Sequence, residues 1–355
     1  MPEHLHIVGA RPNFIKAAPV ISALKEAGAD PLLVHTGQHY EPALSHVFFD
    51  QLGLPEPDRN LGVGSGSHAA QTAALLVALE ELVMEIEPDR VVVYGDINST
   101  LAGSLVASKL HVPVAHVEAG LRSFDRSMPE EINRIVTDAL SDLHFTTSPE
   151  AANHLAREGL DPAGVHFVGN PMIDTLLRFR ERLDVDSAKA RFGLDGDYAV
   201  CTLHRPANVD DLERATTLVS ALRRVAKEVP ILLPLHPRGK ETLQKAGLFD
   251  VPGLEVREPL GYLEFMALVS GAALVMTDSG GIQEETTVLG VPCLTLRENT
   301  ERPITVEMGT NRLVGHDADL IYDAAVEALA SPPPSEVPPL WDGEAGKRIA
   351  KILYR

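Results

Sequence analysis

Short apolar runs rich in β-branched residues alternate with longer segments of helical period along the first half of the chain. This alternation is typical of βαβ units, in which helices cover both faces of a parallel sheet. We therefore predict an N-terminal, doubly wound, Rossmann-like α/β domain at residues 1–172. Its expected strands are 4–9, 31–36, 90–96, 113–119, 143–148 and 165–170.

The same rhythm restarts after the charged segment 178–197 and predicts a second Rossmann-like domain at residues 173–335. A length of 355 residues also fits two domains. The prolines of 331–339 exclude a regular helix or strand there. Segment 336–355 has apolar residues at helical spacing, so we expect a C-terminal helix that packs back on the N-terminal domain. The second set of strands is 198–204, 231–236, 254–258, 272–278 and 292–296.

The composition mainly excludes classes of binding partner. Hydrophobic residues make up 45% and charged residues 23% of the chain, as in globular proteins. The formal net charge of −19 opposes binding to nucleic acid or to an anionic membrane surface, so we expect neither partner. No apolar run approaches the roughly 20 residues of a membrane span. The first residues lack a signal-peptide pattern, which together with the low cysteine content predicts a cytoplasmic location.

Cofactor and metal motifs are not found. Cys201 and Cys293 form no Cys-x-x-Cys pair, and there is no His-Glu-x-x-His spacing, so we predict no metal. The glycine-rich segment 62–67 follows no expected strand, and there is no Walker A sequence. The sequence therefore predicts no nicotinamide cofactor and no nucleoside triphosphatase activity.

The segment "TDSGGIQEE" follows an expected strand and begins a helix. Ligands of open parallel sheets bind beyond the carboxyl ends of the strands. Ser279, Gly280 and Gly281 could therefore present backbone N–H groups to a phosphate. The alternative is a capped turn, with Asp278 or Ser279 as N-cap and two glutamates balancing the helix dipole.

A similar turn, "VGARPNFIK", places Arg11 and Lys16 near the first strand, either as a clamp for a diphosphate or as a surface basic pair. Ionisable groups also stand at four other strand ends. Each could be structural by itself, but the set favours a site. Its members are Asp96, Glu118, His204 and His236.

Glu130 lies at an expected helix start in "SMPEEINR". Acidic residues are common there because they complement the helix dipole, so position alone favours a capping role over catalysis.

The order of these motifs resembles the UDP-N-acetylglucosamine 2-epimerases over nearly the whole chain. The matching blocks are "GARPNFIKAAPV", "HTGQHY", "YGDINSTLAGSLVA", "HVEAGLRS", "MPEEINR", "GNPMIDT", "DSGGIQEE" and "TERPIT". The resemblance implies a GT-B-like fold, as in nucleotide-sugar glycosyltransferases, with uridine diphosphate in the cleft that separates the two domains. It also implies a homodimer and no cofactor.

The resemblance further implies roles for individual residues. Proton chemistry would fall to Asp96, Glu118, Glu130 and His204. Glu285 would bind the ribose, and Phe265 would lie against the uracil. The other groups lining the nucleotide sugar would be Arg11, Lys16, His236, Ser279, Gly280, Gly281 and Arg302.

The implied activity is the interconversion of UDP-N-acetylglucosamine and UDP-N-acetylmannosamine, through elimination of UDP to a glycal. A hydrolysing epimerase, an epimerase of a UDP-diacetamido uronic acid and a UDP-sugar glycosyltransferase are the enzyme alternatives. A non-catalytic nucleotide-sugar binding protein would need no carboxylates such as Asp96 and Glu118. Leu260 replaces a glutamine that is frequent in the family.

Overall fold

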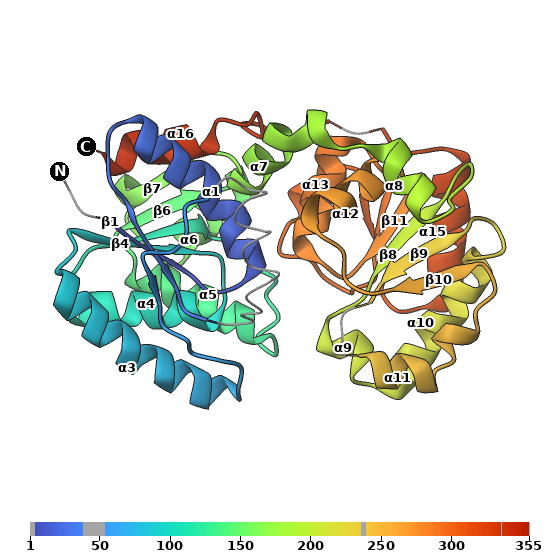
Figure 1. The fold of residues 1–355 in the computed structure, drawn as a ribbon, viewed down its shortest axis with the longest axis horizontal. Coiled ribbons are helices and arrows are strands. Elements are labelled where there is room, and N and C mark those ends of the chain that lie inside the picture. The colour runs from blue at the N-terminus through green and yellow to red at the C-terminus, as the bar shows by residue number, and fades with distance from the viewer. Residues whose placement is uncertain (1–3, 38–53, 236–238, 335, 355) are drawn as a thin grey trace. The chain divides into compact units, whose positions relative to one another are not determined.

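The computed structural model describes residues 4–37, 54–235, 239–334 and 336–354. The chain folds into two compact units. Unit 1 comprises Met1–Arg178 and Pro339–Arg355, and unit 2 comprises Phe179–Pro338. Both are α/β units with interleaved helices, so the predicted fold class is confirmed (Figure 1).

Unit 1 contains a seven-stranded, wholly parallel sheet in the order β3-β2-β1-β4-β5-β6-β7. The order reverses at β1 and β4, which defines the topological switch point of the sheet. The strands are β1 (His4–Val8), β2 (Leu32–His35), β3 (Arg59–Asn60), β4 (Arg90–Tyr94), β5 (Val114–Ala119), β6 (Leu143–Thr146) and β7 (Val165–Phe167).

Strand β3 corrects one expectation from the sequence. Segment 62–67 does follow a strand, because Arg59 and Asn60 pair in parallel with β2, and a helix follows. Both β3 residues are exposed, so the strand has no apolar pattern from which it could have been predicted.

Helices with apolar faces cover the sheet of unit 1 (Figure 1). Proline occupies the first or second helical position in four of them, where its missing N–H costs no hydrogen bond. The helices are α1 (Arg11–Glu26), α3 (His68–Ile86), α4 (Asn98–Lys109), α5 (Pro129–Leu140), α6 (Pro149–Arg157), α7 (Pro171–Phe179) and α16 (Ala345–Leu353).

The C-terminal helix α16 packs against α1 within unit 1. Asp174 of α7 accepts hydrogen bonds from the backbone N–H groups of Ala345 (3.2 Å) and Gly346 (2.7 Å), and so caps α16 from another helix. Trp341 is buried and donates its indole N–H to the carbonyl of Thr147. As predicted, the described residues of 331–339 form neither helix nor strand.

Unit 2 contains a six-stranded parallel sheet in the order β10-β9-β8-β11-β12-β13, with its switch point at β8 and β11. The strand β13 was not predicted. The strands are β8 (Ala199–Thr202), β9 (Ile231–Pro234), β10 (Leu254–Arg257), β11 (Leu274–Thr277), β12 (Cys293–Thr295) and β13 (Asn311–Leu313). The helices are α8 (Val185–Arg191), α9 (Pro206–Val209), α10 (Leu212–Val225), α11 (Lys240–Lys245), α12 (Tyr262–Ser270), α13 (Gly280–Leu289), α14 (Ile304–Glu307) and α15 (Ala318–Ala330).

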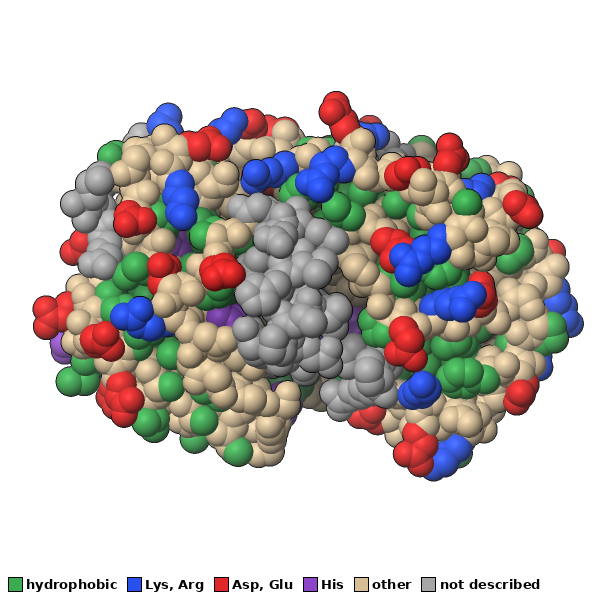
Figure 2. Space-filling view, in the orientation of Figure 1, with side chains coloured by type: hydrophobic (Ala, Val, Ile, Leu, Met, Phe, Trp, Pro, Cys, Tyr) green, Lys and Arg blue, Asp and Glu red, His purple; other side chains and the backbone are tan. Residues whose placement is uncertain are grey.

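On the visible face of each unit, acidic, basic and apolar side chains are interspersed (Figure 2). Across the described residues, no helix combines the length and apolar character needed to cross a membrane. The same part of the chain contains no group of three His, Cys, Asp or Glu side chains arranged to hold a metal ion.

Candidate functional site

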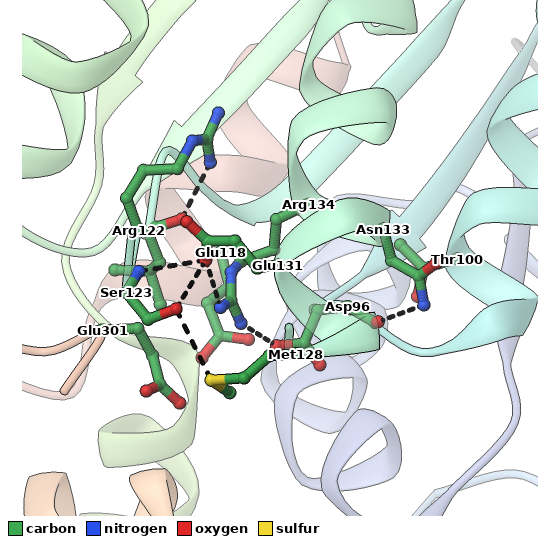
Figure 3. Close-up of polar contacts among 12 residues, drawn as sticks. Asp96, Thr100, Glu118, Arg122, Ser123, Met128, Glu131, Asn133, Arg134 and Glu301 are labelled. Atoms are coloured by element: carbon green, nitrogen blue, oxygen red, sulfur yellow. Dashed lines mark hydrogen bonds and ion pairs between the residues drawn. The ribbon is translucent and has the colours of Figure 1, made fainter. Parts of the chain in front are cut away.

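In unit 1, Asp96 lies two residues after the end of β4, at the switch point of the sheet. Its carboxylate pairs with a guanidinium nitrogen of Arg134 at 2.5 Å, and its backbone carbonyl accepts a hydrogen bond from Asn133 at 2.9 Å (Figure 3). The Asp96 side chain is 23% exposed, whereas that of Arg134 is 1% exposed. A buried cation therefore holds a carboxylate that remains accessible to a ligand.

Glu118 lies on the neighbouring strand β5 at a β-bulge, where the register with β6 shifts. Its backbone has φ +74°, a left-handed conformation that is rare for a residue with a side chain. Such strain persists only where the surroundings enforce it, and it is concentrated at functional sites. The buried Glu118 carboxylate forms an ion pair with Lys16 of α1.

Gly95 shows how closely these groups lie. A Cβ atom on Gly95 would stand 3.1 Å from Glu118 Oε2 and 3.1 Å from Lys16 Nζ. The Lys16–Glu118 pair therefore packs directly on the residue that precedes Asp96. The structure thus brings together three residues that the sequence predicted for the site.

Glu130 and Glu131 differ although both lie in the first turn of α5. Glu130 is half-buried. Glu131 is buried and accepts hydrogen bonds from the backbone N–H groups of Ser123 and Phe124 and from Arg134 (Figure 3). Burial raises the pKa of Glu131, but these hydrogen bonds and Arg134 outweigh it and hold the pKa below its ordinary value. Glu131 thus orders the loop that follows β5, a role that the sequence did not reveal.

Two predicted residues are not fully described. Arg11 begins α1, but its side chain lies outside the described part of the chain. His236 lies outside the described residues altogether. Their predicted roles stay predictions.

In unit 2, the turn that follows β11 leads into α13 at Gly280. Ser279 occupies the N-cap position, but its side chain makes no capping hydrogen bond. The first turn of α13 contains no acidic residue, because Glu284 and Glu285 lie in the second turn. Ser279 is therefore at the predicted N-cap position, but no side-chain hydrogen bond caps the helix there. The first backbone N–H groups of a helix have no intrahelical partners and can bind an anion, and the role of Ser279, Gly280 and Gly281 in binding phosphate stays a prediction.

Asp278 turns away from α13 and toward the chain that follows β8. Its buried carboxylate pairs with His204 Nδ1 at 2.7 Å and accepts the backbone N–H of Arg205 at 2.9 Å. Burial raises the pKa of Asp278, but the charge and hydrogen bond of His204 outweigh it and keep the pKa below its ordinary value. The His204 side chain is 44% exposed. Asp278 therefore orients an accessible imidazole at the switch point of unit 2, a role that the sequence did not suggest.

Arginines gather at the start of α13. Arg302 pairs with Glu284 at 3.0 Å and with Glu301 at 2.7 Å. A Cβ atom on Gly280 would stand 2.3 Å from Arg302 Nη1, so the guanidinium packs on the first residue of the helix. Arg205 contacts the same Glu301 oxygen at 3.2 Å. Cations and a helix N-terminus together favour a phosphate ligand.

Glu285 faces Tyr262 of α12, whose hydroxyl donates a hydrogen bond to it at 3.0 Å. Burial raises the pKa of Glu285 to about 8. Phe265, three residues after Tyr262 on the same helix, is half-buried.

A separate cavity of about 670 Å³ in unit 2 has no predicted site residue among the described residues that line it. Because it contains neither the acids nor the start of α13, we do not place the chemistry there. Its described lining is Arg191, Phe192, Leu235, Lys240, Phe249, Val256, Arg257, Glu258, Pro259, Leu260, Gly261 and Glu264.

Two units, each built on a doubly wound parallel sheet, define a GT-B-like α/β protein. The family model described as UDP-N-acetylglucosamine 2-epimerase matches residues 22–354. A UDP-N-acetylglucosamine 2-epimerase of Methanocaldococcus jannaschii is 44% identical over 98% of this chain and 97% of the relative. The chain therefore belongs to the UDP-N-acetylglucosamine 2-epimerase family.

Two further comparisons bear on the substrate. A UDP-2,3-diacetamido-2,3-dideoxy-D-glucuronate 2-epimerase of Pseudomonas aeruginosa is also 44% identical, over 99% of both chains. A crystal structure of the Methanocaldococcus jannaschii UDP-GlcNAc 2-epimerase in complex with UDP-GlcNAc and UDP matches with a TM-score of 0.93. The two chains are 43% identical in sequence, and the match covers 99% of each chain.

Proposed function

We propose that this protein catalyses the reversible interconversion of UDP-N-acetylglucosamine and UDP-N-acetylmannosamine. The observation that carries the proposal is the pairing of two kinds of chemistry in one chain. Unit 1 gathers Asp96 with the strained Glu118, and unit 2 places Gly280 and Arg302 at the start of α13, where they would bind a phosphate. Family membership and a similar structure with bound UDP-GlcNAc and UDP support the choice of substrate.

The substrate's own chemistry explains why carboxylates are needed. The hydrogen on carbon 2 of the sugar ring is not adjacent to a carbonyl carbon, so its removal alone has no enolate to stabilise it. If the proton leaves as the C1–O bond to UDP breaks, the electron pair forms the double bond of a 2-acetamidoglucal. Returning UDP to carbon 1 and a proton to the other face of carbon 2 inverts that centre. This sequence requires a base, an acid and stabilisation of the departing diphosphate.

The proton transfers fall to the carboxylates of unit 1. In our proposal Asp96, Glu118 and Glu130 exchange protons with the substrate. Arg134 and Lys16 hold the first two in place, since they pair with Asp96 and Glu118 respectively. Lys16 also adds positive charge near the nucleotide sugar.

In our proposal, unit 2 binds the nucleotide. Ser279, Gly280 and Gly281 would bind the diphosphate through the start of α13, and Arg302 would neutralise its charge. His204, oriented by Asp278, would stabilise UDP as it leaves.

The remaining predicted contacts complete the nucleotide site in our proposal. Glu285 would bind the ribose hydroxyls and Phe265 would lie against the uracil. Arg11 and His236 would also contact the nucleotide sugar, as the family resemblance implies.

The proposal is tested by incubating the purified protein with UDP-N-acetylglucosamine and no acceptor, then separating the products by ion-pair chromatography. UDP-N-acetylmannosamine should appear and reach a constant ratio with the substrate. Free N-acetylmannosamine accumulating with UDP would instead establish the hydrolysing alternative.

The diacetamido uronic acid alternative is favoured by one observation, the equal identity of the Pseudomonas aeruginosa relative. Measuring kcat/KM for both nucleotide sugars separates the two. We expect the larger value for UDP-N-acetylglucosamine, and a larger value for the uronic acid would reassign the substrate.

We further propose that the protein is a cytoplasmic homodimer that feeds envelope polysaccharide synthesis. The proposal rests on the family resemblance. Light scattering after size-exclusion chromatography should give twice the 38.3 kDa chain mass, and a monomer mass would contradict the dimer.

A further inference from the structure

His116 connects two strands beneath the candidate catalytic carboxylates. It lies on β5, and its side chain is completely buried. Its Nε2 hydrogen bonds to the carbonyl oxygen of Gly95 at 2.7 Å, and its Nδ1 to Asp138 Oδ1 at 2.6 Å. Gly95 immediately precedes Asp96, so His116 contacts the backbone that carries this carboxylate.

Asp138 of α5 extends this connection to Gly120, in the loop that follows β5. Its second oxygen, Oδ2, accepts the backbone N–H of Gly120 at 3.1 Å, two residues after Glu118. The same oxygen pairs with Arg122 at 2.7 Å, and Arg122 in turn binds Glu158 through two nitrogens. Burial raises the pKa of Asp138, but His116 and Arg122 outweigh it and hold the pKa below its ordinary value.

One residue of the backbone held in this way, Glu118, is strained. Gly95, Glu118 and Gly120 all have positive φ, at +63°, +74° and +79°. The two glycines adopt this conformation without strain, whereas the side chain of Glu118 disfavours it, so surrounding contacts must hold Glu118 in place. The His116–Asp138 pair supplies such contacts on both sides, at the Gly95 carbonyl and at the Gly120 N–H.

We propose that the buried His116–Asp138 pair is a positioning element that holds Asp96 and Glu118 in register for proton transfer. His116 touches neither carboxylate and acts through the backbone of Gly95. The inference rests on the proposed epimerase function, since it assigns these residues a task within that reaction. A misplacement of about 1 Å at reacting groups can lower a rate roughly 100-fold.

His144 provides a matched control. It is a buried histidine on β6, paired in register with His116, and its Nε2 hydrogen bonds to the backbone carbonyl of Asp138 at 2.8 Å. Replacing it removes a comparable buried ring and hydrogen bond from the same sheet without removing a contact to Gly95. If His116 had a purely structural role, replacing His116 or His144 would lower kcat and thermal stability to the same extent.

The test compares kcat, KM, UDP affinity and thermal unfolding for the full-length wild type, His116→Asn and His144→Asn. We expect His116→Asn to lower kcat about 10- to 100-fold with UDP affinity within about twofold. His144→Asn should leave kcat within about threefold at a similar loss of thermal stability. Equal losses of kcat in the two variants, or an unchanged kcat in His116→Asn, would overturn the proposal.

Two further variants keep the test decisive if His116→Asn does not fold. His116→Gln retains an N–H donor on a longer side chain and should recover part of kcat. Asp138→Asn keeps the side-chain volume but loses the carboxylate, and should lower kcat in the same way. A folded Asp138→Asn protein with wild-type kcat would overturn the proposal. A wild type inactive on UDP-N-acetylglucosamine would refute the proposed function instead, so the two failures are distinguishable.

Discussion

The two units have the same architecture but carry different functional groups at their switch points. In unit 1, the ends of β4 and β5 carry Asp96 and Glu118, and buried cations pair with both. In unit 2, β11 leads to glycines at a helix start, where a buried carboxylate, Glu301, orders the surrounding arginines. Parallel sheets place polar groups at the same edge in both units, and the residues that follow the strands decide which charge gathers there.

This difference separates two tasks that one reaction needs. Carboxylates paired with buried cations, as Asp96 and Glu118 are, suit proton transfer, whereas backbone N–H groups with arginines suit a diphosphate. The separation predicts that changes in unit 1 alter turnover and that changes at the start of α13 alter nucleotide affinity.

The largest effect is expected from Asp96→Asn. The substitution keeps the size of the side chain but removes a proton-transfer group, a loss that costs about 10²- to 10⁴-fold in rate. We expect kcat to fall in that range while UDP affinity, measured by calorimetry, stays within about twofold. Preserved activity would remove Asp96 from the catalytic assignment and with it the contrast between the two units.

Gly280→Ala should have the opposite effect, a loss of UDP affinity instead of a loss of turnover. The added Cβ atom would stand 2.3 Å from Arg302 Nη1 and displace the guanidinium from the start of α13. We expect UDP affinity to fall roughly tenfold or more, because charge-assisted contacts to phosphate are lost. Gly290→Ala at the other end of α13, where φ is +72°, is the control, since it strains the helix end and should lower stability without weakening UDP binding. Equal UDP affinities in the two variants would refute the phosphate site.

Glu285 gives a pH-dependent prediction. Burial raises its pKa to about 8, so the free protein holds this proton at pH 7. Ribose hydroxyls donate hydrogen bonds and favour the carboxylate form, so UDP binding should release up to one proton and tighten as the pH rises toward 8. Calorimetry in buffers of different ionisation enthalpy measures the release, and Glu285→Gln should abolish it. Binding heats independent of the buffer in the wild type would contradict the ribose role.

The smallest effect concerns stability alone. Asp174→Ala removes the acceptor for the two N–H groups that begin α16, and capping losses cost about 0.5–2 kcal/mol. We expect the free energy of unfolding of unit 1, measured by urea denaturation, to fall by that amount with UDP affinity unchanged. A loss of UDP affinity in this variant would show that the two units are not separable in this way.

Part of this arrangement was predictable from the sequence because it depends on local pattern. Among the strands of the described residues, apolar runs located all except β3 and β13, which have two and three residues. The residues that follow those runs, among them Asp96 and His204, could be singled out as candidates for the same reason.

The partners of these residues could not be predicted. Arg134 is 38 positions from Asp96, and Asp278 is 74 positions from His204. Their pairing depends on how helices and strands pack, which hydrophobic periodicity does not specify. The strain at Glu118 is also invisible in the sequence, because it arises from a β-bulge at a residue with no preference for positive φ. Position within the first turn did not distinguish Glu130 from Glu131, although only Glu131 is fully buried.

The most direct test of the central claim is proton NMR of the protein with UDP-N-acetylglucosamine in heavy water, without an acceptor. The account predicts deuterium at carbon 2 in a mixture of gluco and manno nucleotide sugars for the wild type, and no exchange on the same timescale for Asp96→Asn. Epimerisation in the wild type without deuterium at carbon 2 would contradict proton transfer by the unit 1 carboxylates.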